Sequence, residues 1–449
     1  MLQNIFSIVV ALGVLITFHE FGHYYVARRC GVKVLRFSVG FGKPIYRYVS
    51  KKTGTEFTLA MIPLGGYVRM LDEREGNVPE AIKHQAFTQK NVWQRIAIVA
   101  AGPLANFILA VAIYGLVALL GIQSLAPKVG HIAEDSLASQ TQMQEGDELV
   151  EVAGEAVSSW EEVNLALAGL IGQTRTIIVR YRVEGLSSIQ QDTVSLNRWL
   201  VGEEPNNLIQ SFGLLPWQPT VAPVIAQVVD GGAAQVGGFV AGDTIESIDG
   251  EAMSSWQQVV KKVQTSPSKR LTVVVLRQGQ SKTLSLTPAA AERNGKVMGY
   301  AGLAVVPPKW DESLIRERHY GVFEAIGYGF QQTAKMVSLT VSSIGKMLQG
   351  LISLDNLSGP ITIAKVASAS ADSGLQSFLK FMAYLSVSLG VLNLLPIPML
   401  DGGHLLFFSI EAIRRKPVSE KVQGVAYRVG ASLLFALMAV AIFNDIARL

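Results

Sequence analysis

The sequence predicts an α-helical polytopic membrane protein with four transmembrane helices and, between the second and the third, two tandem soluble units of the α+β class. Composition is the first sign. The mean hydropathy is +0.32, and 16% of the 449 residues are charged, against about 25% in ordinary soluble domains. Long uncharged stretches and an internal repeat are the other two signs. The net charge of +4, without any Lys/Arg-rich run, argues against a nucleic-acid partner.

The first predicted transmembrane helix covers residues 1–27. It holds no acidic or basic residue before the HEFGH segment and continues through it as an apolar stretch, long enough to cross a hydrocarbon core of about 30 Å. A secretory signal peptide would show a basic n-region and a small-residue cleavage site, and this stretch has neither. We therefore expect it to be retained as a membrane span.

Three further stretches are predicted to cross the membrane. They are residues 96–120, residues 380–412, whose apolar part runs from about Phe381 to Leu400, and residues 425–445. The weaker stretch Val322–Leu354 is interrupted by Glu324, Lys335 and Lys346. Residues 320–378 are therefore predicted to form amphipathic helices at the membrane interface and not a fifth span.

Loop charge predicts the orientation of these spans. Lys and Arg outnumber Asp and Glu between Arg28 and Arg95, and the short connection after the third span contains Arg414, Arg415 and Lys416. Positively charged short loops stay on the cytoplasmic side. We expect a protein of the bacterial inner membrane that contacts membrane lipid, with both soluble units in the periplasm and the basic loops in the cytoplasm.

The cytoplasmic loop, residues 28–95, contains two strand-like segments, FSVGFGKPIYRY and EFTLAMIPLGGYVRM, which are apolar and broken by Gly and Pro. One interpretation is a β-hairpin that dips into the membrane, where its edge would hold a substrate in extended form. Non-helical backbone at that depth must lie against protein or water. The other interpretation is a hairpin on the protein surface. The sequence leaves both open.

The soluble region contains a repeat. GDELVEVAGEAVSSWEEV begins at Gly146, and GDTIESIDGEAMSSWQQV begins at Gly242. Each copy predicts a strand, a turn and a helix that starts near Ser-Ser-Trp, and the pattern resembles tandem PDZ domains, here at residues 125–220 and 221–310. PDZ domains bind peptides by pairing them with an open sheet edge. The two units are expected either to capture a peptide or to act as a passive steric filter.

The segment His19-Glu20-Phe21-Gly22-His23 matches the pattern H-E-x-x-H. On a helix its two histidines lie one turn apart on one face and can bind one Zn²⁺, and Glu20 can take a proton from an attacking water. The alternative is a pair of hydrogen-bonded histidines near a helix end. Ionisable groups inside an apolar span are costly to insert and therefore indicate a functional site.

A catalytic zinc needs a third protein ligand and an open position, and Asp401 in the segment NLLPIPMLDGGH is the best candidate. His19 and His23 lie near the cytoplasmic end of the first span, and Asp401 lies near the cytoplasmic end of the third. A fifth span at 322–354 would move Asp401 to the opposite face, about 30 Å away. The metal site and the four-span topology thus support each other.

These motifs together resemble the site-2 protease family of intramembrane zinc metalloproteases over nearly the full chain. The motifs are HEFGH in the first span, AGPLAN in the second, the tandem repeat, and NLLPIPMLDG in the third span. The resemblance implies Zn²⁺ held by His19, His23 and Asp401, with Glu20 as the catalytic base and Asn393 positioning the substrate backbone. It also implies single-span membrane protein substrates, namely an anti-sigma factor already trimmed on its periplasmic side and remnant signal peptides.

Other residues keep two interpretations. Gly65, Gly66, Pro396 and Pro398 could shape a site for an extended substrate, or they could be turn and kink residues. Asn106 could face the site, with helix packing as its favoured role. Two other functional classes compete with a protease: a metal-ion transporter, which an absence of inverted repeats makes unfavourable, and a membrane-anchored PDZ scaffold. Neither class requires a carboxylate such as Glu20 beside the metal ligands.

Overall fold

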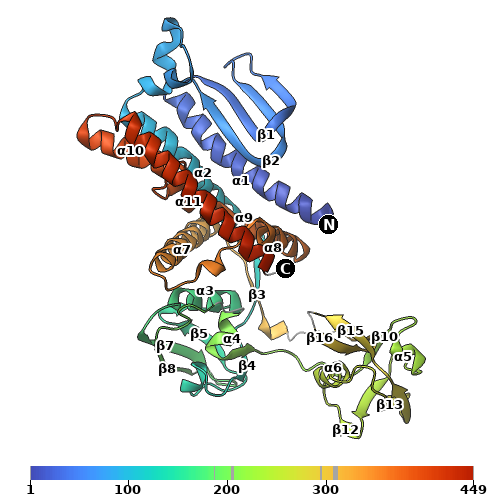
Figure 1. Cartoon of the computed structure of the whole chain (residues 1–449). Coiled ribbons are helices and arrows are strands. Elements are labelled where there is room, and N and C mark those ends of the chain that lie inside the picture. The colour runs from blue at the N-terminus through green and yellow to red at the C-terminus, as the bar shows by residue number, and fades with distance from the viewer. Residues whose placement is uncertain (1, 187, 204–206, 294–295, 307–311, 448–449) are drawn as a thin grey trace.

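The computed structural model of the chain describes residues 2–186, 188–203, 207–293, 296–306 and 312–447. Figure 1 shows long helices gathered in one bundle, with a β-hairpin beside the first helix at one end of the bundle and the two repeat units beyond the other end. The candidate site lies in the bundle, toward the hairpin end.

Within the described residues, four helices are long and apolar enough to cross a membrane. They are α1 (Leu2–Arg29), α2 (Val92–Leu119), α9 (Leu375–Leu394) and α11 (Glu420–Ala447). The core between α1, α2 and α9 is closed by side chains such as Leu15, Ala110 and Val387, which are almost fully buried. In contrast, α11 buries little of its surface, which fits a helix whose side chains face lipid.

The predicted third span, residues 380–412, is not one helix. The structure divides it into α9 and α10 (Asp401–Arg414), joined by a short non-helical connection. Pro396 and Pro398 explain the break, because proline lacks a backbone N–H and disfavours helical geometry in the residue before it. The break places Asp401 at the first turn of a new helix and not in the middle of a span.

The loop after α1 forms a two-stranded antiparallel hairpin, β1 (Val34–Val49) and β2 (Glu56–Met70). The hairpin lies along α1, and a Cβ added at Gly66 would lie 3.0 Å from Ile16 Cγ2 and 3.1 Å from Glu20 Cγ. Its distal part exposes large apolar side chains: Phe41, Ile45, Tyr46, Met61 and Ile62. The 3₁₀ helices Glu73–Glu75, Glu80–Gln85 and Phe87–Gln89 lead from the hairpin to α2.

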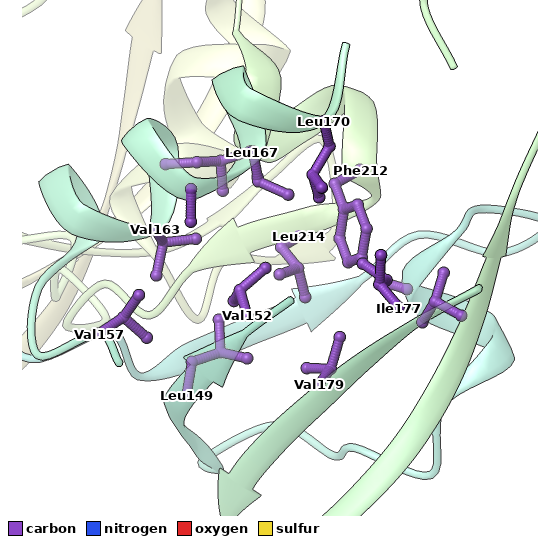
Figure 2. Close-up of a cluster of buried hydrophobic side chains, with 14 of the residues drawn as sticks. Leu149, Val152, Val157, Val163, Leu167, Leu170, Ile177, Val179, Phe212 and Leu214 are labelled. Carbon is purple, nitrogen blue, oxygen red and sulfur yellow. The ribbon is translucent and has the colours of Figure 1, made fainter. Parts of the chain in front are cut away.

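The first repeat unit has two small sheets and a covering helix. Its elements are β4 (Val129–Ile132), the 3₁₀ helix Ala138–Gln140, β5 (Glu148–Val152), β6 (Glu155–Ala156), α3 (Trp160–Leu170), β7 (Arg175–Arg182), β8 (Ile189–Leu196), α4 (Leu208–Phe212) and β9 (Leu214–Pro216). The strands run in the order β6-β5-β7-β8, and β4 pairs with β9. Figure 2 shows the core, in which Leu167 and Leu170 of α3 face Val152, Ile177 and other strand residues.

The second unit repeats this arrangement. Its elements are β10 (Ile225–Val228), α5 (Ala233–Val236), β11 (Thr244–Ile248), β12 (Glu251–Ala252), α6 (Trp256–Gln264), β13 (Leu271–Arg277), β14 (Gln280–Leu286), β15 (Ala289–Arg293), β16 (Lys296–Tyr300) and β17 (Leu303–Val305). The Gly-Asp turns serve the same structural purpose in both units. Asp147 accepts a hydrogen bond from Gln144 N at 2.8 Å, and Asp243 accepts one from Val240 N at 3.0 Å.

Two short strands close the repeat region. β3 (Ile122–Leu125), which follows α2, pairs in antiparallel fashion with β18 (Ile315–Arg318), which follows the second unit and the 3₁₀ helix Glu312–Leu314. The chain therefore leaves the bundle and returns to it at one place. Next, α7 (Val322–Leu348) packs along α2, where Gly329 lies against the Val111 carbonyl, and Lys346 Nζ donates to Gly169 O of α3 at 2.7 Å.

The last span is anchored at its C-terminal end by Asp445. This buried carboxylate accepts hydrogen bonds from Gly359 N at 3.0 Å, Ile361 N at 2.7 Å and Thr362 Oγ1 at 2.6 Å. The donors belong to the start of α8 (Pro360–Asp372), which follows the 3₁₀ helix Leu354–Asn356, and Figure 1 shows the C-terminus beside α8. Asp445 thus satisfies the free N–H groups and the positive dipole end of α8.

We expect Asp445→Ala to detach α11 from α8. Hydrogen bonds to a charged group contribute roughly 1.5–3 kcal/mol each, and the change leaves several buried donors unsatisfied. The melting temperature of the detergent-solubilised protein should fall, and backbone amides near Gly359 should exchange faster with solvent. Ile446→Ala, at the exposed neighbouring position, is the control. Equal melting temperatures and exchange rates in both variants would contradict this role for Asp445.

Candidate metal centre

Three side chains with metal-binding atoms converge in the bundle. His19 and His23 lie one turn apart on α1 and are both buried, and Asp401 is the first residue of α10. The two Nε2 atoms are 3.3 Å apart, and Asp401 Oδ2 lies 3.2 Å from His19 Nε2 and 3.5 Å from His23 Nε2. The structure thus brings the three predicted ligands together, although Asp401 is remote from the histidines in sequence.

These three atoms fit a tetrahedral zinc ion. Zinc with metal–ligand bonds of about 2.0–2.1 Å separates its ligand atoms by about 3.3 Å, which is close to each side of the triangle. Among the described residues, the buried Asp401 Oδ2 has no hydrogen-bond partner. A buried carboxylate oxygen without a hydrogen-bond donor is unfavourable, and a cation between the three atoms would remove that cost. Three protein ligands also leave one position open for chemistry.

The outer nitrogens of both histidines are occupied by groups of α2. His23 Nδ1 lies 2.8 Å from the Ile98 carbonyl oxygen, which is an acceptor only, so Nδ1 carries the proton and Nε2 is free for a metal. His19 Nδ1 lies 3.1 Å from Asn106 Nδ2. Such contacts to the outer nitrogen orient metal-binding histidines and fix their tautomer.

Two glycines allow the face of α1 that carries His19 and His23 to lie directly against α2. A Cβ at Gly22 would overlap the Ala101 carbonyl, and a Cβ at Gly102 would overlap His23 Nε2 and lie 2.9 Å from His19 Cε1. Neither glycine was singled out from the sequence. The sequence signal for this close packing is one glycine inside HEFGH and another inside AGPLAN, because small residues allow close approach of membrane helices.

Further contacts set the position of Asp401. A Cβ at Gly402 would overlap the Leu394 and Leu395 carbonyls, so only glycine allows α10 to fold back on the end of α9. Arg95 of α2 makes a two-pronged ion pair with Glu411 of α10, with nitrogen–oxygen distances of 2.5 and 3.2 Å. The C-terminal part of α10 is thereby held against the first turn of α2. No local sequence pattern predicts this ion pair.

Glu20 lines a cavity of about 260 Å³ that includes the predicted metal ligands His23 and Asp401. The remaining lining comes from β2, the loop after it, α2 and α10: Val68, Arg69, Met70, Asp72, Arg74, Phe87, Ile98, Val99 and His404. The cavity thus joins the metal-binding atoms to charged side chains beyond the end of the hairpin. A carboxylate beside a metal in a polar cavity is suited to accept a proton from water.

The predicted substrate-binding residues lie at different places around the centre. Gly66 lies beside Glu20, and a Cβ at Gly65 would overlap the Phe41 ring instead. Asn393 is partly buried near the end of α9, and Pro396 is exposed in the connection to α10. Pro398 packs against Gly430 of α11. Pro398 therefore has a packing contact with α11. Of the two hairpin glycines, Gly66 is the one that lies next to the predicted base Glu20.

Comparison with known proteins settles the family. A model of "Peptidase family M50" matches residues 7–437. The chain belongs to peptidase family M50. Membership makes it an intramembrane metalloprotease with Zn²⁺ as cofactor, which confirms the predicted site-2 protease resemblance and excludes the transporter and scaffold alternatives as its main activity.

The relatives are similar over their full length. A Vibrio cholerae protein whose name includes the words "zinc metalloprotease" is 44% identical, with 100% of this chain and 99% of the relative covered. The "Regulator of sigma-E protease RseP" of Escherichia coli is also 44% identical, with the same coverage. Among solved structures, the PDZ domain of an SdrC-like protein of Listeria monocytogenes covers 24% of this chain and 100% of its own, with 18% identity and a TM-score of 0.17.

Proposed function

We propose that His19, His23 and Asp401 hold the catalytic Zn²⁺ of this protease and that Glu20 is its general base. One observation carries the assignment: the triangle of ligand atoms with sides of 3.2, 3.3 and 3.5 Å, open toward the cavity that Glu20 lines. The triangle has the dimensions that a tetrahedral zinc ion requires. A structural pair of histidines would not need the oxygen of Asp401 to lie between them.

The reaction is peptide-bond hydrolysis. Zn²⁺, when bound, acts as a Lewis acid that makes water more acidic and polarises the scissile carbonyl. Glu20 accepts the proton of the attacking water and then returns it to the leaving amine. The Ile98 carbonyl holds the proton of His23 on Nδ1, so the Nε2 lone pair faces the centre. The surrounding apolar helices exclude bulk water and strengthen these electrostatic interactions.

The substrate is a membrane-spanning segment that unwinds near the centre. Helical backbone hides its carbonyls in hydrogen bonds, whereas an extended segment can pair with a strand edge. The hairpin supplies strands beside α1, and Gly66 allows β2 to approach Glu20 closely. Asn393 would bind the substrate backbone, with Gly65, Pro396 and Pro398 shaping the surroundings. These residues supply shape and hydrogen bonds, while Glu20 supplies the proton transfer.

The site end of the bundle faces the cytoplasm of a bacterial inner membrane, and the two repeat units lie in the periplasm as PDZ-like domains. The basic residues Arg28 and Arg29 end α1 at the site end, and Arg414 to Lys416 follow the centre after α10. The positive-inside rule then sets the orientation. Metal chemistry occurs near the cytoplasmic surface, and the repeat units meet the substrate on the periplasmic side.

The proposed substrate is an anti-sigma factor that another protease has first trimmed on the periplasmic side, as part of the envelope stress response. Relatives are named as regulators of sigma-E. A cavity of about 750 Å³ lies among α3, the β3–β18 ribbon, α7 and α9. A folded domain of 100 residues has a radius of gyration of about 13 Å and cannot enter this space, whereas a short extended stub can. Remnant signal peptides, which are also single spans, form a second substrate class.

Metal removal tests the proposal. The purified protein in detergent is given a single-span model substrate, and mass spectrometry identifies the products. A chelator should abolish cleavage, one equivalent of Zn²⁺ should restore it, and the cut bond should lie inside the apolar segment. His19→Ala should bind less than one zinc and stay inactive after zinc is added. Full cleavage by metal-free protein, or full zinc binding by His19→Ala, would contradict the proposed centre.

A further inference from the structure

Asn106 is a fully buried polar residue of the bundle. The residue is on α2 and is 0% exposed. Its Nδ2 lies 3.1 Å from His19 Nδ1, and its Oδ1 has no hydrogen-bond partner among the described residues. A buried amide oxygen without a donor costs roughly 1–3 kcal/mol. Such a group is expected to gain a partner in the working form of the protein.

His19 can supply that partner. If His19 binds zinc through Nε2, the neutral ring carries its proton on Nδ1, which is then a donor. Rotating the Asn106 amide by half a turn exchanges its nitrogen and oxygen, which have nearly the same shape. Oδ1 then faces the Nδ1 proton at hydrogen-bond distance. One rotation therefore satisfies the orphan oxygen and removes a donor-to-donor contact.

We propose that Asn106 is a positioning residue for the metal centre, with its side-chain oxygen accepting a hydrogen bond from His19 Nδ1–H. The inference rests on the proposed role of His19 as a zinc ligand. It gives His19 the same arrangement as His23, whose Nδ1 faces the Ile98 carbonyl oxygen at 2.8 Å. Helix α2 then orients both imidazoles, one through a main-chain carbonyl and the other through a side chain.

The packing contact of Asn106 involves its main-chain carbonyl and not its side chain. Ser386 Oγ of α9 donates to the Asn106 main-chain carbonyl at 2.8 Å, and any residue at position 106 keeps that carbonyl. The described hydrogen-bond contact of the side chain is with His19. The packing contact and the proposed positioning contact can therefore be removed separately, by Ser386→Ala and by substitution of Asn106.

The test measures zinc affinity and not only cleavage. The full chain in detergent is titrated with Zn²⁺ against a chelating indicator, and the absorption spectrum of the Co²⁺-loaded protein reports ligand geometry. Loss of a hydrogen-bond partner of a metal ligand weakens metal binding by about 10–100-fold. We expect this loss for Asn106→Leu, together with a changed Co²⁺ spectrum. Asn106→Asp, which keeps the acceptor, should bind zinc within a few-fold of the wild type, and Ser386→Ala should match it.

Wild-type zinc affinity in Asn106→Leu would overturn the positioning role, as would equal weakening in Asn106→Asp and Asn106→Leu. Asn106→Ala carries the same expectation as the leucine variant should the latter not fold. His19→Ala separates this proposal from the ligand assignment. If His19→Ala loses zinc affinity while Asn106→Leu and Asn106→Ala do not, the ligand assignment stands and the positioning role falls. If His19→Ala keeps wild-type affinity, both fall.

Discussion

Glu20→Gln should lower the rate of substrate cleavage by about 10²–10⁴-fold, the usual contribution of a general base, while the protein still binds one zinc. Glutamine has nearly the shape of glutamate but cannot accept the proton of the attacking water. The three ligand atoms belong to other residues, and their triangle does not include the Glu20 side chain. Cleavage is followed with the single-span model substrate, and bound zinc is measured by elemental analysis on the same sample.

Glu80→Gln is a matched control, because it makes the same glutamate-to-glutamine change at another position. The Glu80 side chain is 89% exposed and lies outside the cavity. It should leave both cleavage and zinc content unchanged. Cleavage at the wild-type rate in Glu20→Gln would remove Glu20 from the mechanism. Loss of zinc from Glu20→Gln would show that this carboxylate supports metal binding itself.

Gly102→Ala should abolish zinc binding and cleavage together. The added methyl carbon would overlap His23 Nε2, the atom proposed to bind the metal, and would lie 2.6 Å from His23 Cε1. The His23 imidazole cannot easily move away, because its Nδ1 is held by the Ile98 carbonyl and the backbone of α1 lies tightly against α2 at Gly22. The expected outcome is a protein with less than one zinc per chain and no detectable product.

Gly13→Ala is the matched control in α1, since a Cβ there meets nothing within 4 Å. Alanine also favours helix by up to about 1 kcal/mol over glycine, so this variant should be at least as stable as the wild type and fully active. Size-exclusion chromatography in detergent shows whether each variant is folded. A folded Gly102→Ala protein with full zinc content would mean that α1 and α2 can separate without loss of the centre.

The sequence predicts two kinds of site residue: residues that are close together in the chain, and charged residues whose place along an apolar stretch suggests their depth in the membrane. His19, Glu20 and His23 form one turn of helix, so their spacing alone places them together. Asp401 could be predicted because a charged residue at the end of an apolar stretch is expected at a definite level in the bilayer. The structure brings the three proposed ligand atoms within 4.8 Å of one another.

Contacts between distant helices could not be predicted from the same patterns. The helix break before Asp401, the ion pair of Arg95 with Glu411, and the approach of Gly102 to His23 depend on how α1, α2 and α10 pack. The hydrophobic periodicity within one segment does not predict how that segment packs against distant helices. Asn106 illustrates the limit: its sequence context favours helix packing, whereas its position beside His19 appears only when α1 and α2 are placed together.

The charges that argued against a fifth span each have a structural partner. Glu324 accepts a hydrogen bond from Gly321 N at the start of α7, at 2.9 Å. Lys335 pairs with Glu155 of the first repeat unit at 3.6 Å, and Lys346 binds the Gly169 carbonyl. Two of these three charges therefore join α7 to the first repeat unit. The prediction of an interfacial amphipathic helix remains a prediction about its place in the bilayer.

The separation of the proposed ligands along the chain has a consequence for biosynthesis. During translation, His19 and His23 are synthesised early, and Asp401 is synthesised only after both repeat units and α9. A nascent chain that has reached α9 already contains the proposed base and two ligands, but it cannot complete the centre. The proposed centre can form only after α10 has been synthesised, so the order of synthesis itself delays activity.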